Sequence, residues 1–245
     1  MVSPAASLPT PARPLTPAAR DRRFFLIMAS AIAVVVLVGF GPTFYLRPMF
    51  TSAPMRAVFY VHGAIFTAWV ALFVTQTALV SARRLDVHRK LGLAGGVLAV
   101  AMVVSGYAAA ITSARRGFMV PGLPPPLVFL AVPFFDLLVF STLVGAGLWL
   151  RRSPVAHKRL MLLSIVSVLT AAIARWPYVL PLGPLVFFGL TDLFVVALAW
   201  HDRRSLGRVH PATLWGGLLL IASQVGRLVI SGTAAWLAFA TWLTR

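Results

Sequence analysis

Residues 62–112 read HGAIFTAWVALFVTQTALVSARRLDVHRKLGLAGGVLAVAMVVSGYAAAIT, and this stretch decides the fold. Two long apolar runs flank a turn, residues 83–90, that is too charged to enter hydrocarbon and therefore predicts where a membrane ends. Polar and aromatic side chains recur through the first run at His62, Phe66, Trp69, Phe73 and Gln76. With 3.6 residues per helical turn these side chains share one stripe, which we expect to face protein rather than lipid.

The composition indicates an integral membrane protein. Of the 245 residues, 60% are hydrophobic and 11% are charged, and the mean hydropathy is +0.90. A soluble core of this size does not bury so much apolar surface. The formal net charge is +17, but the basic residues cluster between apolar runs, so we expect anionic lipid headgroups rather than nucleic acid as partners. The absence of cysteine excludes disulfides, thiolate metal ligands and a catalytic thiol.

Seven apolar segments predict an all-α polytopic bundle that forms one domain over residues 24–245. Residues 1–23 are rich in proline and arginine and should form a disordered tail. The expected spans are residues 24–45, 57–80, 91–112, 127–150, 160–176, 185–200 and 212 to about 237. The sixth, of 16 residues, is short for a hydrocarbon core of roughly 30 Å. The seventh is long enough to kink, or to end in an interfacial segment that carries Trp236 and Trp242.

The distribution of Lys and Arg predicts the orientation of these spans. Fifteen basic residues lie on the side of the N-terminal tail, and five lie on the other side. Positive charge favours the cytoplasmic side, so we expect a cytoplasmic N-terminus and an external C-terminus. Arginine pairs precede His88, His157 and His210 in three successive basic turns. This recurrence fits either an internal repeat or the charge rule alone.

Five ionisable side chains within the spans are predicted to lie in the outer leaflet, namely His62, Asp136, Arg175, Asp192 and Arg227. A lone charge there costs roughly 2.5–3.5 kcal/mol, so we expect the carboxylates to pair with the arginines. One interpretation is structural, with the pairs holding helices together. The other is a hydrated pocket that binds a small solute or serves proton-linked transport, with His62 exchanging protons and Gln76 as a further binding candidate.

Histidines near the predicted cytoplasmic ends of the spans form a second candidate group, His88, His157 and His210, with His201 nearby. Imidazole binds haem iron or another transition metal, so a membrane redox protein is an alternative function. Each histidine is also explained as a polar residue at a span end, and no HxxxH or HExxH spacing occurs. A nucleophilic triad, a P-loop and a dinucleotide fingerprint are absent, and an assembly or scaffold role is a third alternative.

Short motifs over residues 57–176 resemble those of a family of bacterial multi-pass membrane proteins that share a domain of unknown function. The motifs are His62-Gly63 with Gln76 downstream, then His88-Arg89-x-x-Gly92, then His157-Lys158-Arg159-x-Met161 followed by Arg175. The chain departs from that pattern at Leu160, where an aromatic residue is common. The resemblance implies a helical fold in the bacterial cytoplasmic membrane and brings no established activity. The histidines at span ends are also similar, more loosely, to those of di-haem membrane cytochromes of the b type.

Overall fold

The computed structural model describes residues 16–117 and 123–245. Seven helical segments are long and apolar enough to cross a membrane, as the sequence predicts. The helices are α1 (Pro17–Phe40), continued by a π-helical turn η1 (Gly41–Tyr45), α2 (Ala57–Ser81), α3 (Leu85–Arg115), α4 (Pro126–Phe129) with α5 (Ala131–Trp149), α6 (Pro154–Ser167) with α7 (Thr170–Ile173), α8 (Pro184–Leu206), α9 (Pro211–Ile230) and α10 (Ala234–Leu243).

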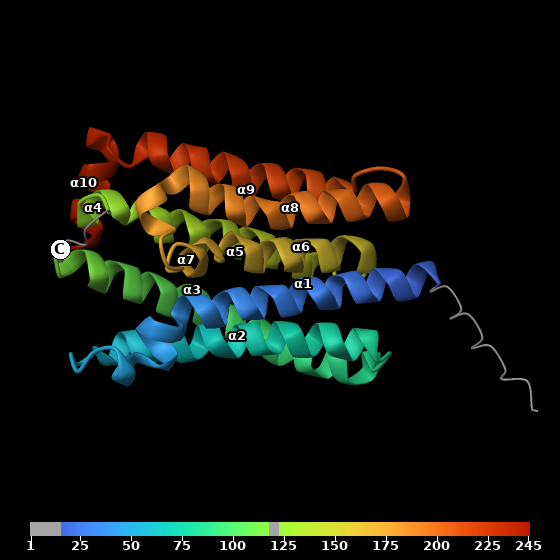
Figure 1. Cartoon of the computed structure of the whole chain (residues 1–245). Coiled ribbons are helices and arrows are strands. Elements are labelled where there is room, and N and C mark those ends of the chain that lie inside the picture. The colour runs from blue at the N-terminus through green and yellow to red at the C-terminus, as the bar shows by residue number, and fades with distance from the viewer. Residues whose placement is uncertain (1–15, 118–122) are drawn as a thin grey trace, which may run out of the picture.

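The long helices lie side by side and alternate in direction (Figure 1). We call the end at which α1 begins the basic end, because the connections at residues 82–84, 150–153 and 207–210 lie there with their arginines. The other end carries α4, α10 and the C-terminus, and we call it the C-terminal end (Figure 1). The alternation follows from the short connections, which make consecutive helices antiparallel neighbours.

Helix α6 is the centre of the bundle. It packs against α1, α5, α8 and α9, and its residues Leu162, Leu163, Ile165 and Val166 are almost completely buried. Beyond its first turns α6 is apolar apart from two serines, and such a helix is stable where neighbours surround it. The stripe of α2 faces protein as predicted: Trp69 is 3% exposed, and the other four side chains of the stripe are half-buried.

Two glycines allow close approaches at the C-terminal end of α1. A Cβ atom on Gly39 would lie 2.2 Å from the carbonyl oxygen of Ala172, so α1 meets the backbone of α7 directly. A Cβ atom on Gly63 would collide with the ring of Phe44, which packs onto α2 at that point. Small residues permit such backbone contact between membrane helices. These contacts fix α1, α2 and α7 against one another around residues 39–44.

Three boundaries differ from the sequence prediction. Helix α1 begins at Pro17, with Thr16 as its N-cap, so residues 17–23 are helical, whereas residues 1–15 of the expected tail lie outside the described residues. Helix α8 runs through its charged end to Leu206, so the sixth span is 23 residues long and not short. The seventh span ends at Ile230, and α10 is a separate helix. In α10, Trp236 is buried and Trp242 is exposed.

Asp21 in the first turns of α1 joins this helix to α6 and α8. Its carboxylate forms an ion pair with Lys158 and lies 3.1 Å from the Nε2 atom of His201. The imidazole of His201 stacks on the ring of Phe24, with ring centroids 3.9 Å apart. The first helix is therefore held at the basic end by charge as well as by apolar packing.

Candidate functional site

His88 and His157 come together at the basic end. His88 lies in the first turn of α3 and His157 in the first turn of α6, and their ring centroids are 6.3 Å apart with an interplanar angle of 82°. The hairpins α2–α3 and α5–α6 pack together through α3 and α5, which brings the two helix starts to one place. Residues separated by 69 positions in the chain thus form a pair of imidazoles.

Hydrogen bonds orient this histidine pair. The Nδ1 atom of His157 lies 2.8 Å from the carbonyl oxygen of Gly147, which can only accept, so Nδ1 carries a hydrogen and, in the neutral tautomer, Nε2 has the lone pair. The Nε2 atom of Gln76 donates to the carbonyl oxygen of His88 at 3.2 Å. The Nδ1 atom of His88 and the Oε1 atom of Gln76 are buried and have no hydrogen-bond partner among the described residues. The site therefore offers an imidazole lone pair beside unsatisfied polar atoms.

The other two histidines at the basic end have different contacts. The Nδ1 atom of His210 accepts a hydrogen bond from the backbone N–H of Ala212 at 3.1 Å and so caps α9. The backbone N–H of His210 donates to Asp202 at 3.0 Å. His201 binds Asp21, as described above. The predicted group of three, His88, His157 and His210, is a pair in the structure, with His210 engaged elsewhere.

Asp136 on α5 and Arg227 on α9 form a buried ion pair, as predicted for two members of the candidate group in the outer leaflet. Arg227 is 2% exposed, and its remaining N–H groups bind the Ser223 hydroxyl at 3.0 Å and the carbonyl oxygens of Ser223 and Val132. The guanidinium and the carboxylate thus satisfy each other. Such a closed pair holds helices together and leaves little capacity for a ligand.

The second predicted pair of that group does not form. Asp192 on α8 accepts a hydrogen bond from the Gln224 amide at 3.0 Å and makes no ion pair with either arginine. Arg175 is exposed, lies over the Phe40 ring at 4.6 Å and donates to the carbonyl oxygen of Ala171. One aromatic contact and one backbone hydrogen bond therefore hold Arg175 at a helix end without a carboxylate. The prediction that Asp192 pairs with an arginine is wrong.

His62 lies on α2, half-buried, with its ring centroid 4.2 Å from that of Phe66. Its Nδ1 atom is buried and has no hydrogen-bond partner among the described residues. The five ionisable residues expected in one cluster are therefore separated: Asp136 pairs with Arg227, Asp192 binds Gln224, and neither His62 nor Arg175 contacts these carboxylates.

A second buried ion pair, Arg159 with Asp202, escaped the sequence reasoning. Both side chains are at most 1% exposed, and the Nε atom of Arg159 lies 2.9 Å from the Asp202 carboxylate. The same carboxylate accepts from the Thr213 hydroxyl at 2.6 Å. Arg159 is one of the fifteen basic residues that the sequence places in the turns on the side of the N-terminal tail. The available signal was Pro154, which is favoured at the first position of a helix and places Arg159 inside α6.

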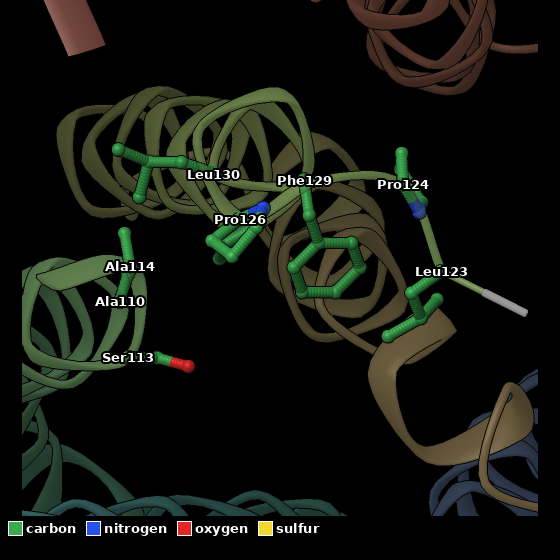
Figure 2. Close-up of a pocket in the computed structure, with 9 residues that line it drawn as sticks. Ala110, Ser113, Ala114, Leu123, Pro124, Pro126, Phe129 and Leu130 are labelled. Carbon is green, nitrogen blue, oxygen red and sulfur yellow. The ribbon is translucent and has the colours of Figure 1, made fainter. Parts of the chain in front are cut away.

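Two hollows in the surface are lined by few polar side chains. One, of about 90 Å³, lies between α3 and α4 at the C-terminal end, and apart from the Ser113 hydroxyl its lining side chains are apolar (Figure 2). The other, of about 400 Å³, is a groove between α5 and α9 whose only charged lining residue is Arg227, already paired with Asp136. Outside these hollows, Gln76 and His88 carry buried polar atoms that have no hydrogen-bond partner among the described residues, and His157 lies beside them.

The seven apolar helices make this chain a multi-pass membrane protein of all-α fold. Comparison with family models, with curated proteins and with solved structures finds no match to this chain, so its function is argued from its own residues.

Proposed function

We propose that this protein is a membrane haem protein in which His88 and His157 bind one haem iron and serve electron transfer. The observation that carries this proposal is the distance of 6.3 Å between their ring centroids. Because a metal–imidazole bond is about 2.0–2.1 Å long, two imidazoles that share one metal have ring centroids roughly 5 to 6.5 Å apart. The observed distance lies within that range.

The donor set favours haem over a bare metal ion. A protein site for a bare transition metal needs three or four side-chain ligands, whereas haem requires only axial ones. Within residues 16–117 and 123–245, no group of three or more His, Cys, Asp or Glu side chains is placed to hold a metal ion. The neighbouring Arg89 carries a positive charge that repels a bare dication and suits the carboxylates of haem. The absence of cysteine makes the attachment non-covalent.

The residues around the pair have positioning roles in this proposal. Gly147 orients His157 through the hydrogen bond to Nδ1, which leaves Nε2 as the ligand atom and makes it more basic. Gln76 holds the first turn of α3 through the carbonyl oxygen of His88. Haem, when bound, supplies one-electron transfer, and the protein sets the potential through these ligands and the surrounding charges.

The test is the absorption spectrum of protein purified from cells with ample haem supply, combined with iron analysis. Wild type should show the bands of six-coordinate haem, with about one iron per chain for one bis-histidine site. His88→Ala and His157→Ala should each abolish them. His210→Ala and His201→Ala are the matched controls, because these histidines occupy the same end but bind Ala212 and Asp21. A wild-type protein without haem, or a loss of haem in the controls alone, would contradict the assignment.

A second candidate function is binding or proton-linked transport of a small anionic solute at the C-terminal end. It is favoured by one observation: at this end the Nδ1 atom of His62 is buried and has no hydrogen-bond partner among the described residues, and the exposed Arg175 contacts the Phe40 ring and a backbone carbonyl but no described carboxylate. A ligand with a negatively charged acceptor group would suit both side chains. Wild-type protein should then gain thermal stability with small carboxylates or phosphate, and Arg175→Gln should lose that gain. Asp192→Asn, which touches neither residue, is the control.

We further propose that the protein resides in the bacterial cytoplasmic membrane, with its basic end at the cytoplasmic surface. The arginine-rich connections at residues 82–84, 150–153 and 207–210 support contact with anionic lipid headgroups. Wild type should bind vesicles that contain phosphatidylglycerol more strongly than neutral vesicles, and salt should weaken the difference.

A further inference from the structure

Four buried side-chain polar atoms have no hydrogen-bond partner among the described residues, and the three that belong to α2 form a line along that helix. The four atoms are Nδ1 of His62, Nε1 of Trp69, Oε1 of Gln76 and Nδ1 of His88. The first three belong to α2 at intervals of seven residues, so they share one face of that helix. The fourth lies beside Gln76, whose amide binds the His88 backbone. Three of the four unsatisfied atoms therefore share one face of α2.

This line extends across most of a bilayer. His62 and Gln76 are 14 residues apart, which is about 21 Å along a helix, against roughly 30 Å for a hydrocarbon core. Trp69 stands between them, 3% exposed, with its ring edge-on to Phe140 at a centroid distance of 5.3 Å. The line therefore begins near the C-terminal end, passes through the core and reaches the basic end.

The hydrogen-bonding requirements of these atoms identify what they bind. The indole N–H of Trp69 only donates, the Oε1 atom of Gln76 only accepts, and an imidazole nitrogen does either. Buried polar groups are almost always paired, either with protein or with ordered water. Water is the one small molecule that both donates and accepts at each point of such a line. Phe66 and Phe73 lie on the same face. This face therefore carries no charged side chain that could replace the hydration shell of an ion.

We propose that this face of α2 lines a proton path, in which a file of water molecules connects His62 with Gln76 and conducts protons across the bilayer. A proton enters at the His62 imidazole, passes from water to water and leaves at the Gln76 end. O–H and N–H bonds alone form and break, and no redox step takes part. Trp69 donates a hydrogen bond that holds the file in the core. The path does not require haem at His88 and His157.

The experiment uses purified full-length protein in liposomes that contain a pH-sensitive dye. A potassium gradient with valinomycin makes the lumen negative, and the dye reports proton entry. Wild type should acidify the lumen faster than protein-free vesicles do. Trp69→Phe keeps the aromatic ring and removes the N–H, so it should slow proton entry by roughly tenfold or more. Trp149→Phe is the matched control, because Trp149 is 84% exposed on α5, and it should conduct like wild type.

Three results would overturn the proposal: wild type no faster than empty vesicles, Trp69→Phe as fast as wild type, or sodium passing as readily as protons. Size-exclusion chromatography and thermal unfolding verify that Trp69→Phe is folded. If that variant unfolds, His62→Gln replaces it, because Gln keeps hydrogen bonding but cannot exchange the proton. The haem spectrum should be unchanged in Trp69→Phe, so failure of the proton path and failure of haem binding are distinguishable.

Discussion

Asp136 and Arg227 join α5 to α9 by an ion pair in which the carboxylate residue is 6% exposed and the arginine 2%. Asp136→Ala leaves a guanidinium that cannot lose its proton, and breaking a buried pair typically costs about 3–5 kcal/mol. We expect Asp136→Ala and Arg227→Ala each to lower the free energy of unfolding in detergent by that order. The double variant should lose less than the sum, which a double-mutant cycle measures.

Asp192 provides the control for that cycle. It is half-buried and accepts one hydrogen bond, from Gln224, so Asp192→Asn should cost less than about 1.5 kcal/mol. Its effect should add to that of Arg227→Ala without coupling, because the two residues form no ion pair. Coupling between Asp192 and Arg227 as strong as that of Asp136 would contradict the observed pairing.

Asp202 is expected to be the most sensitive carboxylate of the chain. Asp202→Ala strands Arg159 and also removes the acceptor for the Thr213 hydroxyl and the His210 backbone N–H. The loss should reach about 3–5 kcal/mol or prevent folding. Asp86→Ala removes an exposed pair in which the Arg84 nitrogen lies 3.7 Å from the carboxylate, and it should change stability by less than about 1 kcal/mol. Thermal unfolding of both variants in one detergent compares their losses of stability. Equal losses in Asp202→Ala and Asp86→Ala would contradict the prediction.

The N-cap of α9 predicts a pH dependence. Burial lowers the pKa of His210, and the nearby Arg159 guanidinium lowers it further. The neutral imidazole accepts the cap hydrogen bond, so its stabilisation is complete above the unfolded pKa of about 6.5 and is lost as pH falls through the folded pKa. His210→Asn keeps an acceptor at this position. Melting temperatures between neutral and mildly acidic pH should fall less in His210→Asn than in wild type, and identical slopes would exclude this role.

Topology can be tested with reporter fusions. We expect a reporter inserted at residues 82–84, in the basic connection between α2 and α3, to be cytoplasmic, and one fused after Arg245 to be external. Enzymatic reporters that are active on only one side of the membrane measure this. A cytoplasmic C-terminus would contradict the proposed orientation, because the helices place Arg245 at the end opposite that connection.

The number of spans was predictable because apolar length and charged turns are local properties of the chain. Local signals also indicated that α2 has a protein-facing stripe. The exact ends of the helices were harder to predict. Helix α8 continues through His201, Asp202 and two arginines, because Asp202 pairs with the buried Arg159. No local sequence pattern reveals that pair. Polar residues normally mark the membrane boundary, and here one of them belongs to the core.

The candidate sites depended on contacts between helices that are distant in sequence. Depth along the spans indicated that Asp136 would meet an arginine, but the choice of Arg227 follows from α5 packing on α9. The same reasoning grouped Asp192 with an arginine, because depth alone does not say which way a side chain points. The meeting of His88 with His157 depends on the packing of two hairpins, and histidine spacing in one chain does not contain that information.

The contacts of Asp21 have a consequence for biosynthesis. Its partners Lys158 and His201 follow it by 137 and 180 residues, so the ribosome adds the second roughly 10 to 40 s after Asp21 at about 5–20 residues per second. Until Lys158 is added, the first helix is in the membrane with neither partner made, and until His201 is added it has only one of them. The contacts of Asp21 are complete only when His201 in α8 has been translated, which makes the full docking of α1 at the basic end a late event in assembly and leaves nascent chains that stop before Lys158 without either contact.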